Sequence, residues 1–69
     1  MTALEIINKW CEVAHSQCKW DHKACFWVIR DILSGVKVSD RLKEDAISWF
    51  LIHVKDTPEK RKIKEAMGI

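Results

Sequence analysis

The residues of this sequence that could perform chemistry are concentrated in one stretch of cysteines and histidines. Their positions differ by four, three, four and three residues: Cys11, His15, Cys18, His22 and Cys25. Zinc accepts thiolate and imidazole ligands in tetrahedral geometry, so a zinc-stapled small domain is one hypothesis. However, side chains in line along one helix cannot all converge on one ion, and the sequence contains no Cys-x-x-Cys pair. We therefore predict no metal, and we interpret these residues as a packed seam in which cysteine acts as a small hydrophobe.

The same residues make a poor active site. Two of the cysteines are followed four residues later by a histidine, which would place thiol and imidazole side by side on a helix. Nucleophilic catalysis also needs an activating environment and an oxyanion site, and the sequence contains no glycine-rich loop or Gly-x-Ser-x-Gly turn. The acidic pair Glu44 and Asp45 is explained by the start of a helix, and His53 by packing in an apolar segment. We expect no enzymatic activity, no catalytic residues, no cofactor and no small-molecule substrate.

The first half of the chain predicts two helices. Thr2 and Glu5 have the spacing of a capping box, which places the start of a helix over residues 3–16. The segment that follows contains nothing that forces a break. Asp21 could cap a second helix over about 22–33, and one continuous helix through residue 33 is the alternative.

The second half predicts two more helices. Gly35 fits the left-handed residue that ends a helix, and a short extended connector follows it. A third helix is expected from about residue 40 to 55, with a serine or an aspartate as its cap. A threonine followed by proline then starts a fourth helix over 58–67, which ends at a glycine.

Composition supports an all-α fold. The chain has 69 residues, of which 48% are apolar and 32% charged, and only two glycines and one proline interrupt it. Few turns imply few strands, so we predict a compact bundle of three to four short helices and a single domain over residues 1–69. A chain of this size buries only roughly 60% of the surface that its unfolded form exposes, which leaves little stability in reserve.

The cellular compartment is predicted from the number of cysteines and from the lack of signal-peptide and membrane-spanning patterns. Three cysteines cannot all pair within one chain, which favours a reducing environment. The first residues lack the charged and apolar regions of a signal peptide, and no apolar run approaches the roughly 20 residues that span a membrane. We expect a cytoplasmic protein that does not contact membranes.

The two central helices carry more apolar side chain than such a chain can cover. Residues 25–29 are all non-polar, and so are residues 49–52. Consecutive helical residues point in directions about 100° apart, so these runs surround their helices. Part of this surface should remain exposed and form a contact with another molecule. The expected interface residues are Trp20, Phe26, Trp27, Trp49, Phe50 and Ile52.

We therefore expect a small non-catalytic regulator, adaptor or inhibitor that binds another protein, with a homodimer as one form of that contact. The alternative in a different class is a DNA-binding regulator. In that alternative the helices over 40–55 and 58–67 form a helix-turn-helix-like pair, and the last helix contacts nucleic acid through Lys60, Arg61, Lys62 and Lys64. Lysines bind phosphate but read little base sequence, and the net charge is only +2, so nucleic acid is the weaker prediction.

Overall fold

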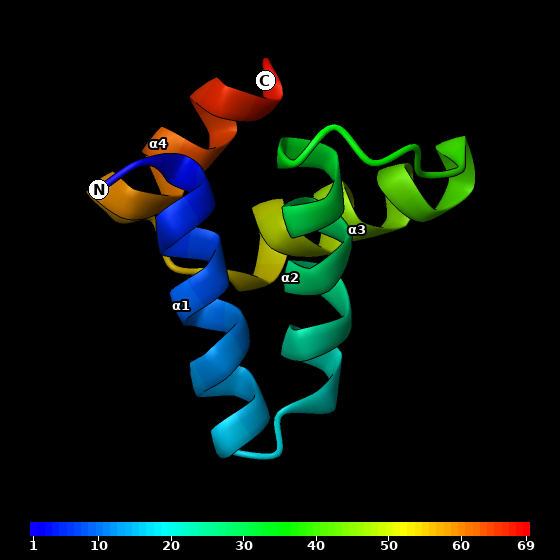
Figure 1. The fold of residues 1–69 in the computed structure, drawn as a ribbon. Coiled ribbons are helices and arrows are strands. Elements are labelled where there is room, and N and C mark those ends of the chain that lie inside the picture. Colours follow the sequence, from blue (N-terminus) through cyan, green and yellow to red (C-terminus); the bar gives the residue numbers. More distant parts are fainter.

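Four helices make up the computed structural model, which describes residues 1–69 and contains no strand. They are α1 (Ala3–Ser16), α2 (Trp20–Leu33), α3 (Asp40–His53) and α4 (Pro58–Met67). The all-α prediction is confirmed. α1 and α2 run side by side in opposite directions, α3 crosses α2, and α4 lies against α1 (Figure 1). None of these helices combines the length and the apolar character that a bilayer crossing requires.

Helix starts follow the local capping signals at three of the four helices. The capping box of α1 is present: the Glu5 amide donates to Thr2 Oγ1 at 3.2 Å, and the Thr2 amide donates to Glu5 Oε1 at 3.1 Å. Ser39 caps α3, and Thr57 caps α4 ahead of Pro58. Each cap satisfies an amide that would otherwise have no partner in the first turn.

The α1–α2 turn differs from the expectation that Asp21 caps the second helix. α2 begins two residues earlier, at Trp20, and its N-cap residue Lys19 makes no side-chain capping bond. α1 ends because Cys18 adopts a left-handed conformation with φ of 55°, and the Lys19 amide donates to the Ala14 carbonyl at 2.9 Å. This bond closes a Schellman motif, in which glycine is the usual left-handed residue. The single continuous helix is therefore excluded, and Asp21 lies in the first turn of α2.

One core joins all four helices. Each helix contributes one fully buried large side chain, namely Ile7, Ile29, Phe50 and Ile63. Trp10 lies between two of the buried rings, with its ring centroid 5.4 Å from that of Phe26 and 6.4 Å from that of Phe50.

The predicted seam of cysteines and histidines is only partly buried. Cys11 and Cys25 lie in the core, whereas His15 and Cys18 are exposed and His22 is half-buried. The reason is the turn at residues 17–19, which places the five residues on two antiparallel helices rather than along one.

Candidate functional site

The six predicted interface residues divide into two groups. Trp20, Trp27 and Ile52 are exposed, with 59%, 48% and 76% of their surface accessible, and Trp49 is half-buried. The rings of Phe26 and Phe50 lie inside the core of this chain and present no surface to a partner in this conformation. The reason is that the apolar runs surround their helices, so some members of each run point inward while others face solvent.

A ladder of alternating aromatic and cationic side chains covers the outer face of α2. Lys23 Nζ lies 4.9 Å from the ring centroid of Trp20 and 5.4 Å from that of Trp27. The guanidinium carbon of Arg30 lies 4.9 Å from the Trp27 ring. Cations in this position are attracted by the electron-rich faces of the rings. We call these four residues, Trp20, Lys23, Trp27 and Arg30, the α2 ladder.

The cationic side chains of the α2 ladder lie on the side of α2 that faces α1. Lys23 Nζ lies 2.7 Å from His15 Nδ1, and the His15 ring meets the Trp20 ring edge-on at 6.0 Å. Burial raises the pKa of Cys11 on α1, and the charges of Arg30 and Lys23 oppose that rise. Arg30 follows Lys23 by seven residues and lies on the same side of the helix, so the two cations form the α1-side flank of the exposed face of α2.

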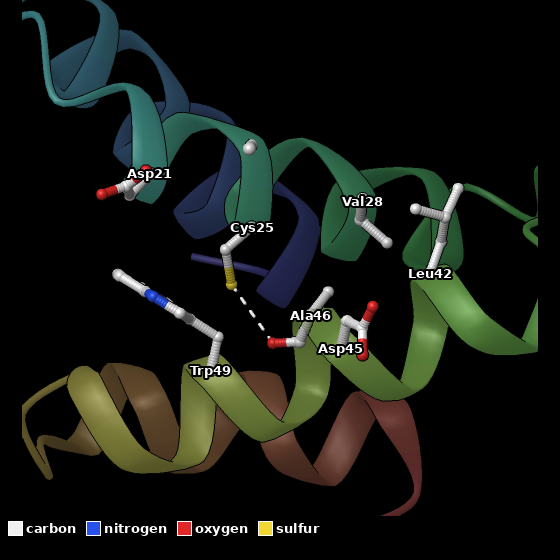
Figure 2. Close-up of a pocket in the computed structure, with 8 residues that line it drawn as sticks. Asp21, Cys25, Val28, Leu42, Asp45, Ala46 and Trp49 are labelled. Atoms are coloured by element: carbon white, nitrogen blue, oxygen red, sulfur yellow. Dashed lines mark hydrogen bonds between the residues drawn. The ribbon is translucent and has the colours of Figure 1, made fainter.

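A shallow groove lies on the other side of α2, between α2 and α3 (Figure 2). It has a volume of about 230 Å³ and a mainly apolar lining. In Figure 2, Asp21 and Trp49 lie at one end of this α2–α3 groove, Val28 and Leu42 lie at the other, and Asp45 stands beside Ala46 on the α3 wall. The lining residues are Asp21, Ala24, Cys25, Val28, Leu42, Asp45, Ala46 and Trp49.

Trp49 is held at the end of the groove by two histidines. The His22 ring contacts it edge-on at 4.8 Å, and the His53 ring lies 4.8 Å away in a tilted arrangement. Aromatic pairs at these separations are favourable beyond their buried area. The half-buried His22 and the exposed His53 thus both lie against the Trp49 ring.

The buried cysteines lack the properties of nucleophiles. Burial raises the pKa of Cys25 to about 12, and its Sγ donates to the Ala46 carbonyl at 3.3 Å. Burial also raises the pKa of Cys11. The thiolate is the reactive form of cysteine, so both side chains are protonated and unreactive near neutral pH.

The donor atoms that suggested a zinc site do not converge. No group of three or more His, Cys, Asp or Glu side chains in the chain has the arrangement of a metal site. Cys11 and Cys25 face the core, whereas His15 and Cys18 face solvent.

The basic face predicted for the last helix is smaller than expected, because Lys60 is buried. Its ammonium donates to the carbonyls of Leu51 at 3.1 Å and Val54 at 2.8 Å, and it lies 5.8 Å from the Phe50 ring centroid. Lys60 therefore closes the carboxyl end of α3 and cannot contact nucleic acid in this conformation. The other three residues remain available: Arg61 and Lys62 are exposed, and Lys64 is half-buried.

α3 and α4 do not form the predicted helix-turn-helix-like pair. α4 packs on α1 and to a smaller extent on α2, and it reaches the carboxyl end of α3 through the Lys60 side chain. The apolar stripe of α4, centred on Ile63, is directed into the core that all four helices share. A recognition helix in a helix-turn-helix is held by the helix before it, and that packing is missing here.

Comparisons with protein-family models, with curated proteins and with solved structures gave no match for this chain. The chemistry of the surface is therefore the guide to function. Sequence reasoning found the exposed tryptophans but overlooked the charges beside them. The spacing of Trp20, Lys23, Trp27 and Arg30, at three, four and three residues, could have revealed the ladder. No local signal could have revealed the α2–α3 groove, because its walls come from different helices.

Proposed function

We propose that this protein is a small non-catalytic regulator or adaptor that acts by binding a protein through the exposed face of α2. The observation that carries this proposal is the pair of half-exposed indoles, Trp20 and Trp27, seven residues apart on one face of one helix. Tryptophan is enriched among the residues that dominate binding energy at interfaces, together with arginine. The α2 ladder offers both residue types side by side.

The energetics of exposed indole favour a docking role over a purely structural one. Burying a large apolar side chain gains about 1.5 to 3 kcal/mol, and this chain leaves about half of that gain unused at each of the two rings. The neighbouring cations hold the rings in place, so a partner would lose little side-chain entropy on contact. The α2–α3 groove extends the apolar surface toward Leu42 and Trp49.

Two further features belong to this proposal. The raised pKa values of the buried thiols favour a packing role for Cys11 and Cys25 over a nucleophilic one. Three unpaired cysteines support a cytoplasmic location, where thiols stay reduced.

The proposal is tested by capture of cross-linked proteins from extracts of the cells that express the chain. We compare the native protein with Trp20→Ala/Trp27→Ala and with the control Arg61→Ala/Lys62→Ala, which alters exposed residues of α4. Circular dichroism verifies that each variant is folded. We expect proteins that are recovered with the native chain and the control and depleted about ten-fold or more with the tryptophan variant, a loss equivalent to about 1.4 kcal/mol.

Two results would contradict the proposal. One is a set of captured proteins that does not depend on the two tryptophans. The other is co-purified nucleic acid that is lost in the α4 variant and retained in the tryptophan variant, which would favour the DNA-binding alternative.

A further inference from the structure

Opposite charges border the exposed face of α2 on its two sides. Lys23 and Arg30 form the flank toward α1: Lys23 contacts His15 of α1, and Arg30, seven residues further on, lies on the same side of α2 over the Trp27 ring. Asp21 and Asp45 belong to the α2–α3 groove and form the flank toward α3. The face is therefore basic along one long edge and acidic along the other.

These charges are not neutralised by hydrogen-bonded partners of opposite sign within the chain. Neither Asp21 nor Asp45 takes part in any side-chain hydrogen bond. The cations of the other flank lie over indole rings instead of against carboxylates. Both flanks thus remain available to charged groups of another molecule.

An apolar line separates the two flanks. Trp20, Ala24 and Trp27 lie along the solvent side of α2, and Ala24 borders the groove. The small Ala24 side chain between the two indoles lets a facing helix approach closely. An apolar centre with a charged rim is the usual anatomy of a protein interface.

The charged groups of the two flanks also lie at matching positions along the axis of α2. Asp21 is two residues from Lys23, which is a rise of about 3 Å along the helix. Figure 2 shows Asp45 opposite Val28 along the groove, and Val28 is two residues from Arg30. Each acidic group therefore lies at nearly the same level as one basic group, on the opposite edge of the face.

This arrangement is self-complementary under one particular symmetry. In an isologous dimer the same patch of both copies meets across a two-fold axis. An axis parallel to α2 keeps each residue at its height and places the basic edge of one copy over the acidic edge of the other. An axis across α2 would instead place like charges together, which is unfavourable.

We propose that the exposed face of α2 binds a second copy of this chain about a two-fold axis nearly parallel to α2, with Lys23 and Arg30 of each copy facing Asp21 and Asp45 of the other. The inference rests on the proposed function, because it names the partner of the same surface. Trp20 and Trp27 meet the same residues of the second copy at the centre. An ordinary interface takes about 800 Å² from each partner, which is about one sixth of the 4857 Å² surface of this chain.

The test is charge reversal with complementation, measured by sedimentation velocity and native mass spectrometry on the whole chain. Lys23→Glu/Arg30→Glu makes both edges acidic, and Asp21→Lys/Asp45→Lys makes both edges basic. Each variant alone should self-associate at least about ten-fold more weakly than the native chain, because like charges then face each other. An equimolar mixture should restore a dimer, and its mass should identify one chain of each kind.

Matched controls carry the same charge changes elsewhere. Arg61→Glu/Lys62→Glu and Asp56→Lys/Glu65→Lys alter exposed residues away from the proposed contact and should dimerise like the native chain. If a reversed variant fails to fold, the neutral variants Lys23→Gln/Arg30→Gln and Asp21→Asn/Asp45→Asn replace it. Their self-association should be weaker and less sensitive to salt than that of the native chain.

Three results would overturn this inference: a chain that stays monomeric up to about 1 mM, a dimer that both reversals leave intact, or a mixture that does not form the mixed dimer. A monomer that still captures a foreign protein through Trp20 and Trp27 would remove only the self-association. A monomer without tryptophan-dependent capture would remove the proposed function as well.

Discussion

Lys60 has a structural role in the fold instead of the solvent-exposed role that the sequence predicts. Its position in a cluster of basic residues predicts a solvated cation, yet the structure buries it against the last turn of α3. The carbonyls at the end of a helix lack intrahelical partners and carry a partial negative charge. The ammonium of Lys60 satisfies two such carbonyls, and α4 is thereby joined to α3.

Replacing the Lys60 ammonium should show how much its contact with the end of α3 contributes to the free energy of unfolding. We expect Lys60→Met, which keeps the length of the side chain, to lower the free energy of unfolding by about 1 to 3 kcal/mol, because the Leu51 and Val54 carbonyls lose a charged donor. Urea denaturation measures the change. Lys62→Met is the matched control at an exposed position and should alter stability by less than about 0.5 kcal/mol. Equal effects of the two substitutions would contradict the structural role of Lys60.

At the level of elements, capping residues decided which helices could be predicted. α1 and α4 begin and end at the predicted residues, because Thr2, Thr57 and the glycine at position 68 act locally. The start of α2 could not be predicted in this way. The turn depends on a left-handed cysteine, Cys18, and the gain that permits its strained conformation comes from packing α2 against α1, which is a tertiary effect.

The capping box of α1 should make stability depend on acid pH. The Thr2 backbone and side-chain hydrogen bonds lower the pKa of Glu5 below its ordinary value of 4.5. A lowered carboxyl pKa contributes stability above pH 4.5, and this contribution is lost as the pH falls through the folded-state value. We expect the native chain to be more stable than Glu5→Gln at pH 6 and the difference to disappear toward pH 3.

Thermal unfolding monitored by circular dichroism across this pH range measures the effect. Glu12→Gln removes an exposed carboxylate from the same helix and serves as the control. A difference between native and Glu5→Gln proteins that stays constant from pH 6 to pH 3 would show that the capping box has no part in acid stability.

For the whole molecule, the core depends on very few side chains. A domain of this length has a total stability of about 3 to 10 kcal/mol. The fully buried large residues are four in number, one from each helix, so the loss of one weakens contacts among several helices. Stability is therefore concentrated in the centre of the bundle.

A matched pair of isoleucines tests this distribution. Ile29→Ala creates a cavity in the core and should cost about 2 to 5 kcal/mol, a large part of the total. Ile52→Ala alters a mainly exposed side chain and should cost less than about 0.5 kcal/mol in dilute solution. Chemical denaturation of both variants gives the comparison, and similar losses would mean that the core lies elsewhere.

The surface could be predicted only in outline. Helices that are apolar all round must leave something exposed in so short a chain, and Trp20, Trp27 and Ile52 are exposed as that rule requires. The rule does not say which residues of each run point inward, and of the six predicted interface residues Phe26 and Phe50 do. Local sequence patterns could not predict the opposite charges of the two flanks. Asp45 belongs to α3, and it lies beside the exposed face of α2 only because α3 crosses α2.

That crossing also sets how α3 moves. α3 packs mainly along α2, and only Ala46 and Phe50 of its fourteen residues are buried. Helices with so few buried contacts detach in sub-global openings well before the whole protein unfolds. The amide protons of α3 should therefore exchange with solvent faster than those of α2, and each opening would separate the two walls of the groove while the α1–α2 hairpin stays intact.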